Sequence, residues 1–114
     1  MARTAATGGV SLTTSLQTLV TNTAADAKVR TYTVDFLNIK AANATTDPDV
    51  TQCVMIDASA SNASRPIMPT NTTIPRGDAK SRKIILDPGD SIQVAASEAG
   101  GIYALVQKVF EEAA

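Results

Sequence analysis

The 114-residue chain contains no histidine, no tryptophan and a single cysteine. Histidine is the most frequent general base near neutral pH and the most frequent ligand for transition metals. One cysteine without histidine cannot provide the ligand set of a structural zinc site. The chain also carries no nucleophile motif of a known hydrolase class. We therefore expect no catalytic residue, no metal site and no cofactor, and the sequence predicts a protein that is not an enzyme.

Other absences exclude some classes of binding partner and indicate the compartment in which the chain is made. The chain's 10 Lys and Arg residues are balanced by 11 Asp and Glu residues, so it has no basic stripe of the kind that binds nucleic acid. No apolar run approaches the ~20 residues needed to cross a bilayer. Met1 to Gly9 lacks the hydrophobic block of a secretory signal. Cys53 stands alone in an apolar stretch, which predicts a buried, reduced thiol in a chain made in a reducing compartment.

Aromatic residues make up only 4% of the chain, although hydrophobic residues make up 44%. The core of a single domain of this length must then consist mainly of Val, Ile, Leu and Ala. We expect the aromatic side chains to join it, namely Tyr32, Phe36, Tyr103 and Phe110. A core of small aliphatic side chains gives modest stability, so the composition favours a protein that assembles with partners.

Short apolar stretches alternate with clusters of Asn, Asp, Ser, Thr, Gly and Pro, which is typical of an all-β sandwich. The predicted strands are Val10–Val20, Val29–Ile39, Val50–Asp57, Arg65–Thr73, Ser81–Leu86, Ser91–Ala96 and Ile102–Phe110. The sequence therefore predicts one β-sandwich, of jelly-roll or immunoglobulin-like type, with about seven to eight antiparallel strands over residues 10–114. Met1 to Gly9 is small, polar and ends in two glycines, which predicts a flexible N-terminal arm.

Alternation of apolar and polar residues predicts which side chains are buried. The predicted core positions on the strands are Tyr32, Val34, Phe36, Val54, Ile56, Ile84, Leu86, Ile92 and Val94. This assignment puts Cys53 and Met55 on the opposite face of their strand. That second face is either covered by a neighbouring subunit or an ordinary scatter of apolar surface residues.

Two segments also show apolar residues at helical spacing, Leu12 to Val20 and Ile102 to Phe110. We predict a strand for the first because its threonines suit a pleated surface. The second follows a pair of glycines, as a hairpin partner would, and ends in two glutamates where a helix dipole favours cations. We predict a strand there too, with a helix over residues 102–112 as the alternative.

Two turns can be read directly. In Asp87-Pro88-Gly89-Asp90, Pro88 presets φ and Gly89 supplies the positive φ that a type II turn requires. Arg76-Gly77-Asp78 spells the tripeptide that integrins read, but Gly and Asp are favoured in any turn. We interpret that tripeptide as an exposed turn, with a binding role of the integrin type as the alternative.

The remaining charged groups are interpreted as surface residues. The aspartates show no calcium-loop spacing, so we interpret them as turn residues rather than ligands; they are Asp47, Asp49, Asp57, Asp87 and Asp90. Lys80, Arg82 and Lys83 form a short basic cluster that we interpret as a solvated strand face. A rim contact to an acidic neighbour is its functional alternative.

The order of several short motifs resembles a group of small virion proteins of tailed phages. The motifs are Leu12 to Thr21, Val29 to Asn38, Ile74 to Asp78 and Leu86 to Ile92, followed by a closing strand that ends near Glu111. Together they cover most of the chain after Gly9. The resemblance implies an accessory particle component of β-sandwich or jelly-roll type. It brings no catalytic motif, so it assigns no site residue.

The resemblance implies a structural protein, and we expect a capsid decoration (cement) protein that binds across neighbouring subunits of the major capsid protein and stabilises the head. Such a protein is made in the host cytoplasm and resides in the virion. We expect a homo-oligomer, with a trimer favoured, and no nucleic-acid or membrane partner. The alternatives are a tail, neck or fibre protein, or a carbohydrate-binding β-sandwich module that stacks sugars on exposed aromatic rings.

Overall fold

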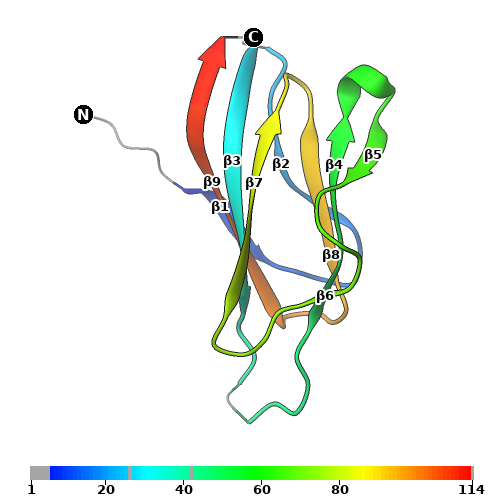
Figure 1. The fold of residues 1–114 in the computed structure, drawn as a ribbon, viewed down its shortest axis with the longest axis vertical. Coiled ribbons are helices and arrows are strands. Elements are labelled where there is room, and N and C mark those ends of the chain that lie inside the picture. The colour runs from blue at the N-terminus through cyan, green and yellow to red at the C-terminus, as the bar shows by residue number, and fades with distance from the viewer. Residues whose placement is uncertain (1–5, 26, 42, 114) are drawn as a thin grey trace, which may run out of the picture.

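The computed structural model describes residues 6–25, 27–41 and 43–113, which form two antiparallel β-sheets packed face to face (Figure 1). The strands are β1 (Ala6–Ser11), β2 (Gln17–Thr21), β3 (Lys28–Asn38), β4 (Asp49–Asp57), β5 (Ala63–Pro66), β6 (Thr72–Thr73), β7 (Ala79–Leu86), β8 (Ser91–Ala96) and β9 (Ile102–Ala113). A single 3-10 turn, η1 (Ala58–Ala60), follows β4 in the described chain. The predicted all-β sandwich is confirmed.

The order of strands is β1-β9-β3-β7 in the first sheet and β2-β8-β4-β5 in the second, where β6 also pairs with β4. We call these sheet A and sheet B. The pairs β1–β9, β2–β8, β3–β7 and β4–β5 are nested, so the first half of the chain runs antiparallel to the second half. The chain reverses direction at η1, and the two antiparallel halves fold over together to form both sheets. Such nesting is jelly-roll topology and differs from the immunoglobulin arrangement.

Three predicted segments have different bounds in the structure. The segment 10–20 is interrupted by the loop between β1 and β2, and the segment 65–73 contains two short strands rather than one. The arm predicted to end at Gly9 is also wrong in its boundary, because Ala6 to Ser11 form β1 and pair with β9. Residues 1–5 lie outside the described residues.

The C-terminal segment is a strand, as predicted, and its helix-like spacing has a local cause. Ile102, Ala104 and Val106 point inward with the two-residue period of a strand. A register shift opposite Thr31 and Tyr32 then inserts one extra residue into β9. After this bulge the inward and outward positions exchange, so Phe110 pairs with Thr31 on the outer face.

The predicted face of β4 is wrong for the same kind of reason. A register shift between Val50 and Gln52 changes the phase of the strand, and Cys53 is buried in the core with 1% of its surface exposed. Met55 packs against that core, whereas Val54 and Ile56 are only half-buried on the outer face of sheet B. The other seven predicted core residues, on β3, β7 and β8, are buried as expected.

The aromatic residues divide between the core and the surface. Tyr32 and Phe36 are buried between the sheets, as predicted. Phe110 is 56% exposed, and Tyr103 is half-buried on the outer face of sheet A, so the expectation that both would join the core is wrong. Large aliphatic residues fill the core instead, including Leu12, Ile74 and Ile102, each with no exposed surface.

The turn between β7 and β8 has the predicted type II form. Gly89 adopts φ +92°, and the N–H of Asp90 donates to the carbonyl of Asp87 at 3.0 Å. The turn is fixed to the residue that follows β2, because the N–H of Gly89 donates to the Asn22 carbonyl at 2.7 Å. The N–H of Asn22 in turn donates to the Asp90 carbonyl at 2.8 Å.

The side chain of Asn22 is fully buried and has its own hydrogen bonds. Its amide nitrogen donates to the carbonyls of Lys28 and Leu86 at 2.8 and 2.9 Å, and its amide oxygen accepts from Arg30 at 2.6 Å. One residue therefore joins the ends of β2, β3 and β7. Because buried polar groups are stable only when they are hydrogen-bonded, Asn22 fixes the separation of the two sheets at this end.

We predict that Asn22→Ala destabilises the fold by roughly 2–4 kcal/mol, because it removes a buried amide that donates to the carbonyls of Lys28 and Leu86. The measurement is urea unfolding of the variant and the parent. Asn43→Ala is the matched control, since Asn43 is exposed in a loop. Equal unfolding midpoints for the Asn22 and Asn43 variants would contradict the importance of this network.

Candidate interaction surfaces

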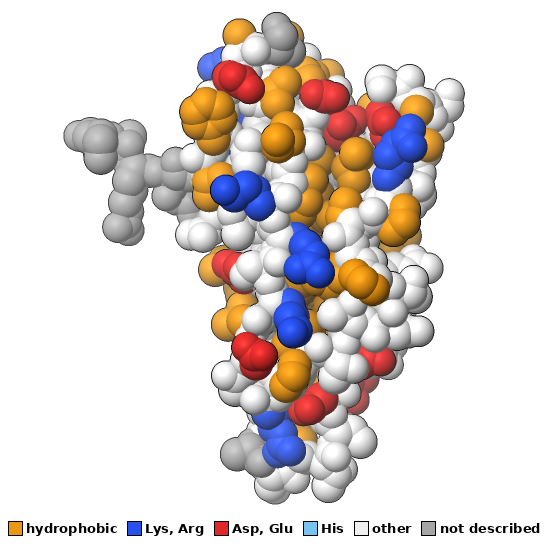
Figure 2. All heavy atoms as spheres, viewed as in Figure 1, with side chains coloured by type: hydrophobic (Ala, Val, Ile, Leu, Met, Phe, Trp, Pro, Cys, Tyr) orange, Lys and Arg blue, Asp and Glu red, His pale blue; other side chains and the backbone are white. Residues whose placement is uncertain are grey.

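The largest exposed apolar side chains on the strands belong mainly to the outer face of sheet A. Across this face, Phe110 and Ile85 lie on either side of Thr31, because both pair with that residue. Ile85 is 64% exposed and Phe110 is 56% exposed. Figure 2 shows hydrophobic side chains over the upper ends of β9, β3 and β7, with Asp and Glu side chains among them and Lys and Arg side chains below them.

The rest of this face becomes polar and then apolar again towards the other end. The next row of paired residues holds Gln107, Thr33 and Lys83, and the row after it holds Leu105, Asp35 and Ser81. The following row holds Tyr103, Leu37 and Ala79. The face therefore has apolar side chains towards both ends, one lysine and one aspartate near its middle, and the exposed Glu112 opposite Val29 at the outer limit of the Phe110 end. Apolar surface of this kind marks a site that another molecule covers.

Tyr103 extends this face over β1. A Cβ atom at Gly9 would overlap the Tyr103 Oη and ring, so only glycine lets the ring lie against the strand. Gly9 pairs with Leu105, next to Tyr103 on β9. The glycine interpreted in the sequence as part of a flexible arm is therefore a packing position beneath an aromatic ring.

Charges cluster near the C-terminal end of β9. The Glu111 carboxylate lies 3.1 Å from Lys28 Nζ and 3.5 Å from Arg30 Nε, and it also pairs with Lys108. Hydrogen bonds from Lys108 and then Lys28 lower the pKa of Glu111 from 4.5 to about 2. This cluster connects the first residues of β3 to the last residues of β9.

The lowered pKa of Glu111 predicts a pH dependence of stability. A carboxyl whose pKa is lower in the folded state stabilises the fold fully above its unfolded pKa of 4.5, and this contribution is lost as the pH falls towards about 2. We expect Glu111→Gln to reduce the pH dependence of the unfolding free energy in that window. Glu112→Gln is the control, because Glu112 is an exposed neighbour. Identical pH profiles for the Glu111 variant and the parent would contradict the ion cluster.

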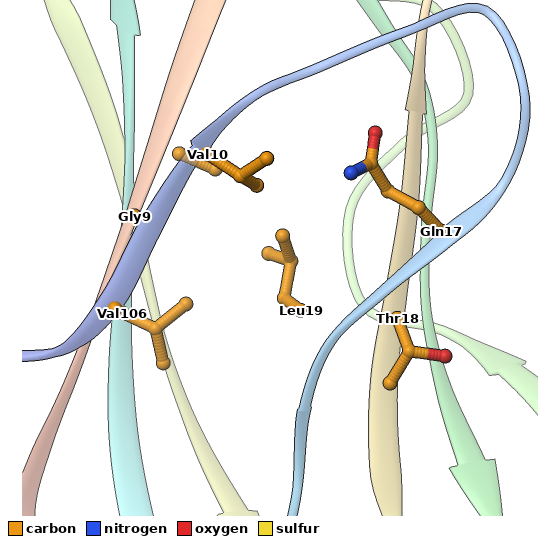
Figure 3. A pocket seen from close by; sticks show the side chains of 8 residues that line it. Gly9, Val10, Gln17, Thr18, Leu19 and Val106 are labelled. Atoms are coloured by element: carbon orange, nitrogen blue, oxygen red, sulfur yellow. The ribbon is translucent and has the colours of Figure 1, made fainter.

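A small groove opens between the edge strands β1 and β2 of the two sheets. It has a volume of about 190 Å³ and is lined by Gly8, Gly9, Val10, Gln17, Thr18, Leu19, Ala104 and Val106. Figure 3 shows the side chains of Val10, Leu19 and Val106 around this space, with Gln17 at one side. Because cofactor and drug-sized ligand sites have volumes of ~300–1,000 Å³, the groove suits one apolar side chain of a partner better than a cofactor.

The Arg76-Gly77-Asp78 tripeptide forms a turn at the opposite end from Asn22. Gly77 has φ +75°, and the N–H of Asp78 donates to the Pro75 carbonyl at 3.1 Å. The Arg76 guanidinium lies 3.6 Å from Asp47, and the Asp78 carboxylate accepts from the N–H of Ala79 at 2.8 Å. The structure thus confirms an exposed turn and shows both charged side chains in local contacts.

The aspartates considered as calcium ligands have separate structural partners. Asp49 accepts from Thr73, and Asp57 accepts from Ser59 and Arg65. Asp90 is 3% exposed, and its two carboxylate oxygens accept from the N–H groups of Ala58 and Asp87. Within the part of the chain that the structure describes, no three Asp, Glu, Cys or His side chains come together as a metal site would require.

The predicted basic cluster on β7 is divided between two faces. Lys83 is exposed on the outer face of sheet A, opposite Thr33. Lys80 and Arg82 pair with Phe36 and Val34, whose side chains point into the sandwich, and both are half-buried. The three residues therefore do not form one basic patch. Only Lys83 remains available for the contact to an acidic neighbour that the sequence suggested.

Cys53 is a buried free thiol, as predicted. Burial raises its pKa from 9.0 to about 12, against a smaller opposing effect of Arg82. Since the thiolate is the nucleophile, this thiol is protected both by its protonation and by lack of access.

We predict that the native protein at pH 8 does not react with Ellman's reagent within minutes, whereas the unfolded protein releases one equivalent. Ser64→Cys serves as the positive control, because Ser64 is exposed on β5. Rapid modification of the native parent would show that sheet A does not cover Cys53.

Sequence reasoning missed the Asn22 network, the groove between β1 and β2, and the mixed character of the outer face of sheet A. The outer face had a signal in the sequence, because the polar positions of the strand predicted over 29–39 are mostly threonines rather than charged residues.

No helix in the described residues is long and apolar enough to cross a membrane. Comparison of the chain with protein-family models, curated proteins and solved structures gave no match.

Proposed function

We propose that this chain is a structural component of a tailed-phage particle, a capsid decoration (cement) protein that binds across neighbouring capsid subunits and stabilises the head. The observation that carries the proposal is the outer face of sheet A, where Ile85 and Phe110 are more than half exposed on a rigid sheet. A protein that functions by packing against other proteins requires such a surface. The order of motifs that resembles small phage virion proteins supports the same role.

The fold suits this role mechanically. Jelly rolls occur in viral capsid and lectin domains, although this likeness is an analogy at the level of the fold. The turns at both ends of the sandwich are fixed by hydrogen bonds, as at Asn22 and at Asp78. Loops held in this way can contact two neighbouring subunits without losing much conformational freedom on binding. A protein that binds only the assembled shell stabilises it by mass action.

Phe110 favours one alternative, a carbohydrate-binding module. Its ring is 56% exposed on a sheet face, and sugars stack on exposed aromatic rings. The two functions differ in the effect of Phe110→Ala. A carbohydrate module would lose glycan binding on an array, whereas a decoration protein would bind no glycan before or after the substitution.

We predict that particles assembled without this protein rupture at lower temperature or in lower salt than complete particles, and that adding the purified protein restores their resistance. Imaging should place the protein over joints between capsid subunits, with more than about 1,000 Å² buried in total at each attachment. If particles without the protein are as robust as complete ones but fail to bind cells, the protein belongs to the tail or fibre rather than to the head. Turnover of a substrate by the purified protein would contradict the structural role.

A further inference from the structure

The pattern of side chains on the outer face of sheet A is complementary to itself. The outward positions of β3 are Val29, Thr31, Thr33, Asp35 and Leu37, and Ile39 continues the series just beyond the end of the strand. Leu37 and Ile39 are 37% and 47% exposed, so one end of the strand matches the apolar character of the other. The midpoint of this series lies between Thr33 and Asp35, next to Lys83 on the neighbouring strand.

We propose that two copies of this chain pair through these faces. The two-fold axis lies in the interface, runs perpendicular to the strands, and passes between the row of Thr33 and the row of Asp35. Under this rotation each row of one copy meets a row of the other in reverse order. Lys83 of one copy then lies over Ser81 and beside Asp35 of the second copy. The row that holds Phe110 meets the row that holds Tyr103, so these two apolar rows face each other, and Glu112, in the row beyond Phe110, lies at the rim.

The alternative two-fold arrangement, with the axis along β3, is disfavoured by charge. It would place Asp35 directly over Asp35 of the second copy, and like charges that face each other at an interface oppose binding. The reversed arrangement instead brings each Lys83 to an Asp35, twice by symmetry. Two sheets that pack face to face in this way lie about 10 Å apart, with their strands within ~30° of alignment.

The size of the face is that of a weak, transient interface, since such complexes bury less than about 1,200 Å² in total. Strands spaced by ~4.8 Å and residues of one face spaced by ~6.8 Å give an area on the order of 500 Å² per copy, or about 1,000 Å² in total. This is at the lower limit of specific interfaces. The dimer should therefore be concentration-dependent, with a dissociation constant in the micromolar range.

The test is sedimentation equilibrium of the purified full chain and of charge variants on this face. We expect a monomer–dimer equilibrium for the parent. Lys83→Glu should weaken it at least about tenfold, because it brings like charges together. Asp35→Lys should weaken it for the same reason, and the double variant should restore the parent affinity because the ion pair is reversed. Gln52→Glu is the control, since Gln52 is exposed on sheet B and its variant should dimerise like the parent.

Several outcomes would overturn the pairing. They are a monomer at all concentrations up to about a hundred times the expected constant, a trimer, a dimer that is insensitive to Lys83→Glu, or a double variant that stays as weak as the single ones. Thermal unfolding of each variant establishes that it is folded. The inference does not rest on the phage role, since particle rupture tests that role separately and dimerisation is measured without particles.

Discussion

The position of the two sheets at one end of the sandwich depends on Asn22. This side chain has no exposed surface, and it donates to the carbonyls of Lys28 and Leu86 while its oxygen accepts from Arg30. Its backbone groups bond to the turn between β7 and β8. In the unfolded chain, water forms hydrogen bonds to the same polar groups. The network therefore favours one particular arrangement of the strands rather than compactness in general. The buried carboxylate of Asp90 extends the same network to the residues after β4.

The jelly-roll topology explains why such a fixed point is needed. Every nested strand pair except β4–β5 joins segments that are far apart in the chain, so local turns determine little of the pairing. Long-range pairing forms only after large loops close, which is entropically costly. The turn at Asp87–Asp90 and Asn22 bring β2, β3 and β7 together at one end, and the Glu111 ion cluster joins β3 to β9 near that end.

The outer face of sheet A carries two of the chain's few aromatic residues, Tyr103 and Phe110. A thin sandwich with few aromatic residues buries Tyr32 and Phe36 and leaves Phe110 outside. The bulge in β9 is the local cause, since it exchanges the faces of the strand after Lys108. An apolar ring on the surface is costly unless a partner covers it. Assembly is therefore the common element of the proposed decoration role and of the two-fold pairing. Where two copies pair through this face, the loops at the ends of the sandwich are left to contact capsid subunits.

The sequence by itself determined the fold class, the strand character of most segments, and the turns at Asp87–Asp90 and Arg76–Asp78. These features depend on local periodicity and on the φ preferences of Pro and Gly, which are readable over a few residues. Only the tertiary structure decided the faces of β4 and β9, because one extra residue in a strand reverses every later side chain and leaves no local signal. It also decided that Gly9 lies beneath Tyr103 rather than in an arm, and that Lys83 and Asp35 share one surface. Those relations join residues from different strands, and pairing across a sheet is determined by the whole chain rather than by any one segment of it.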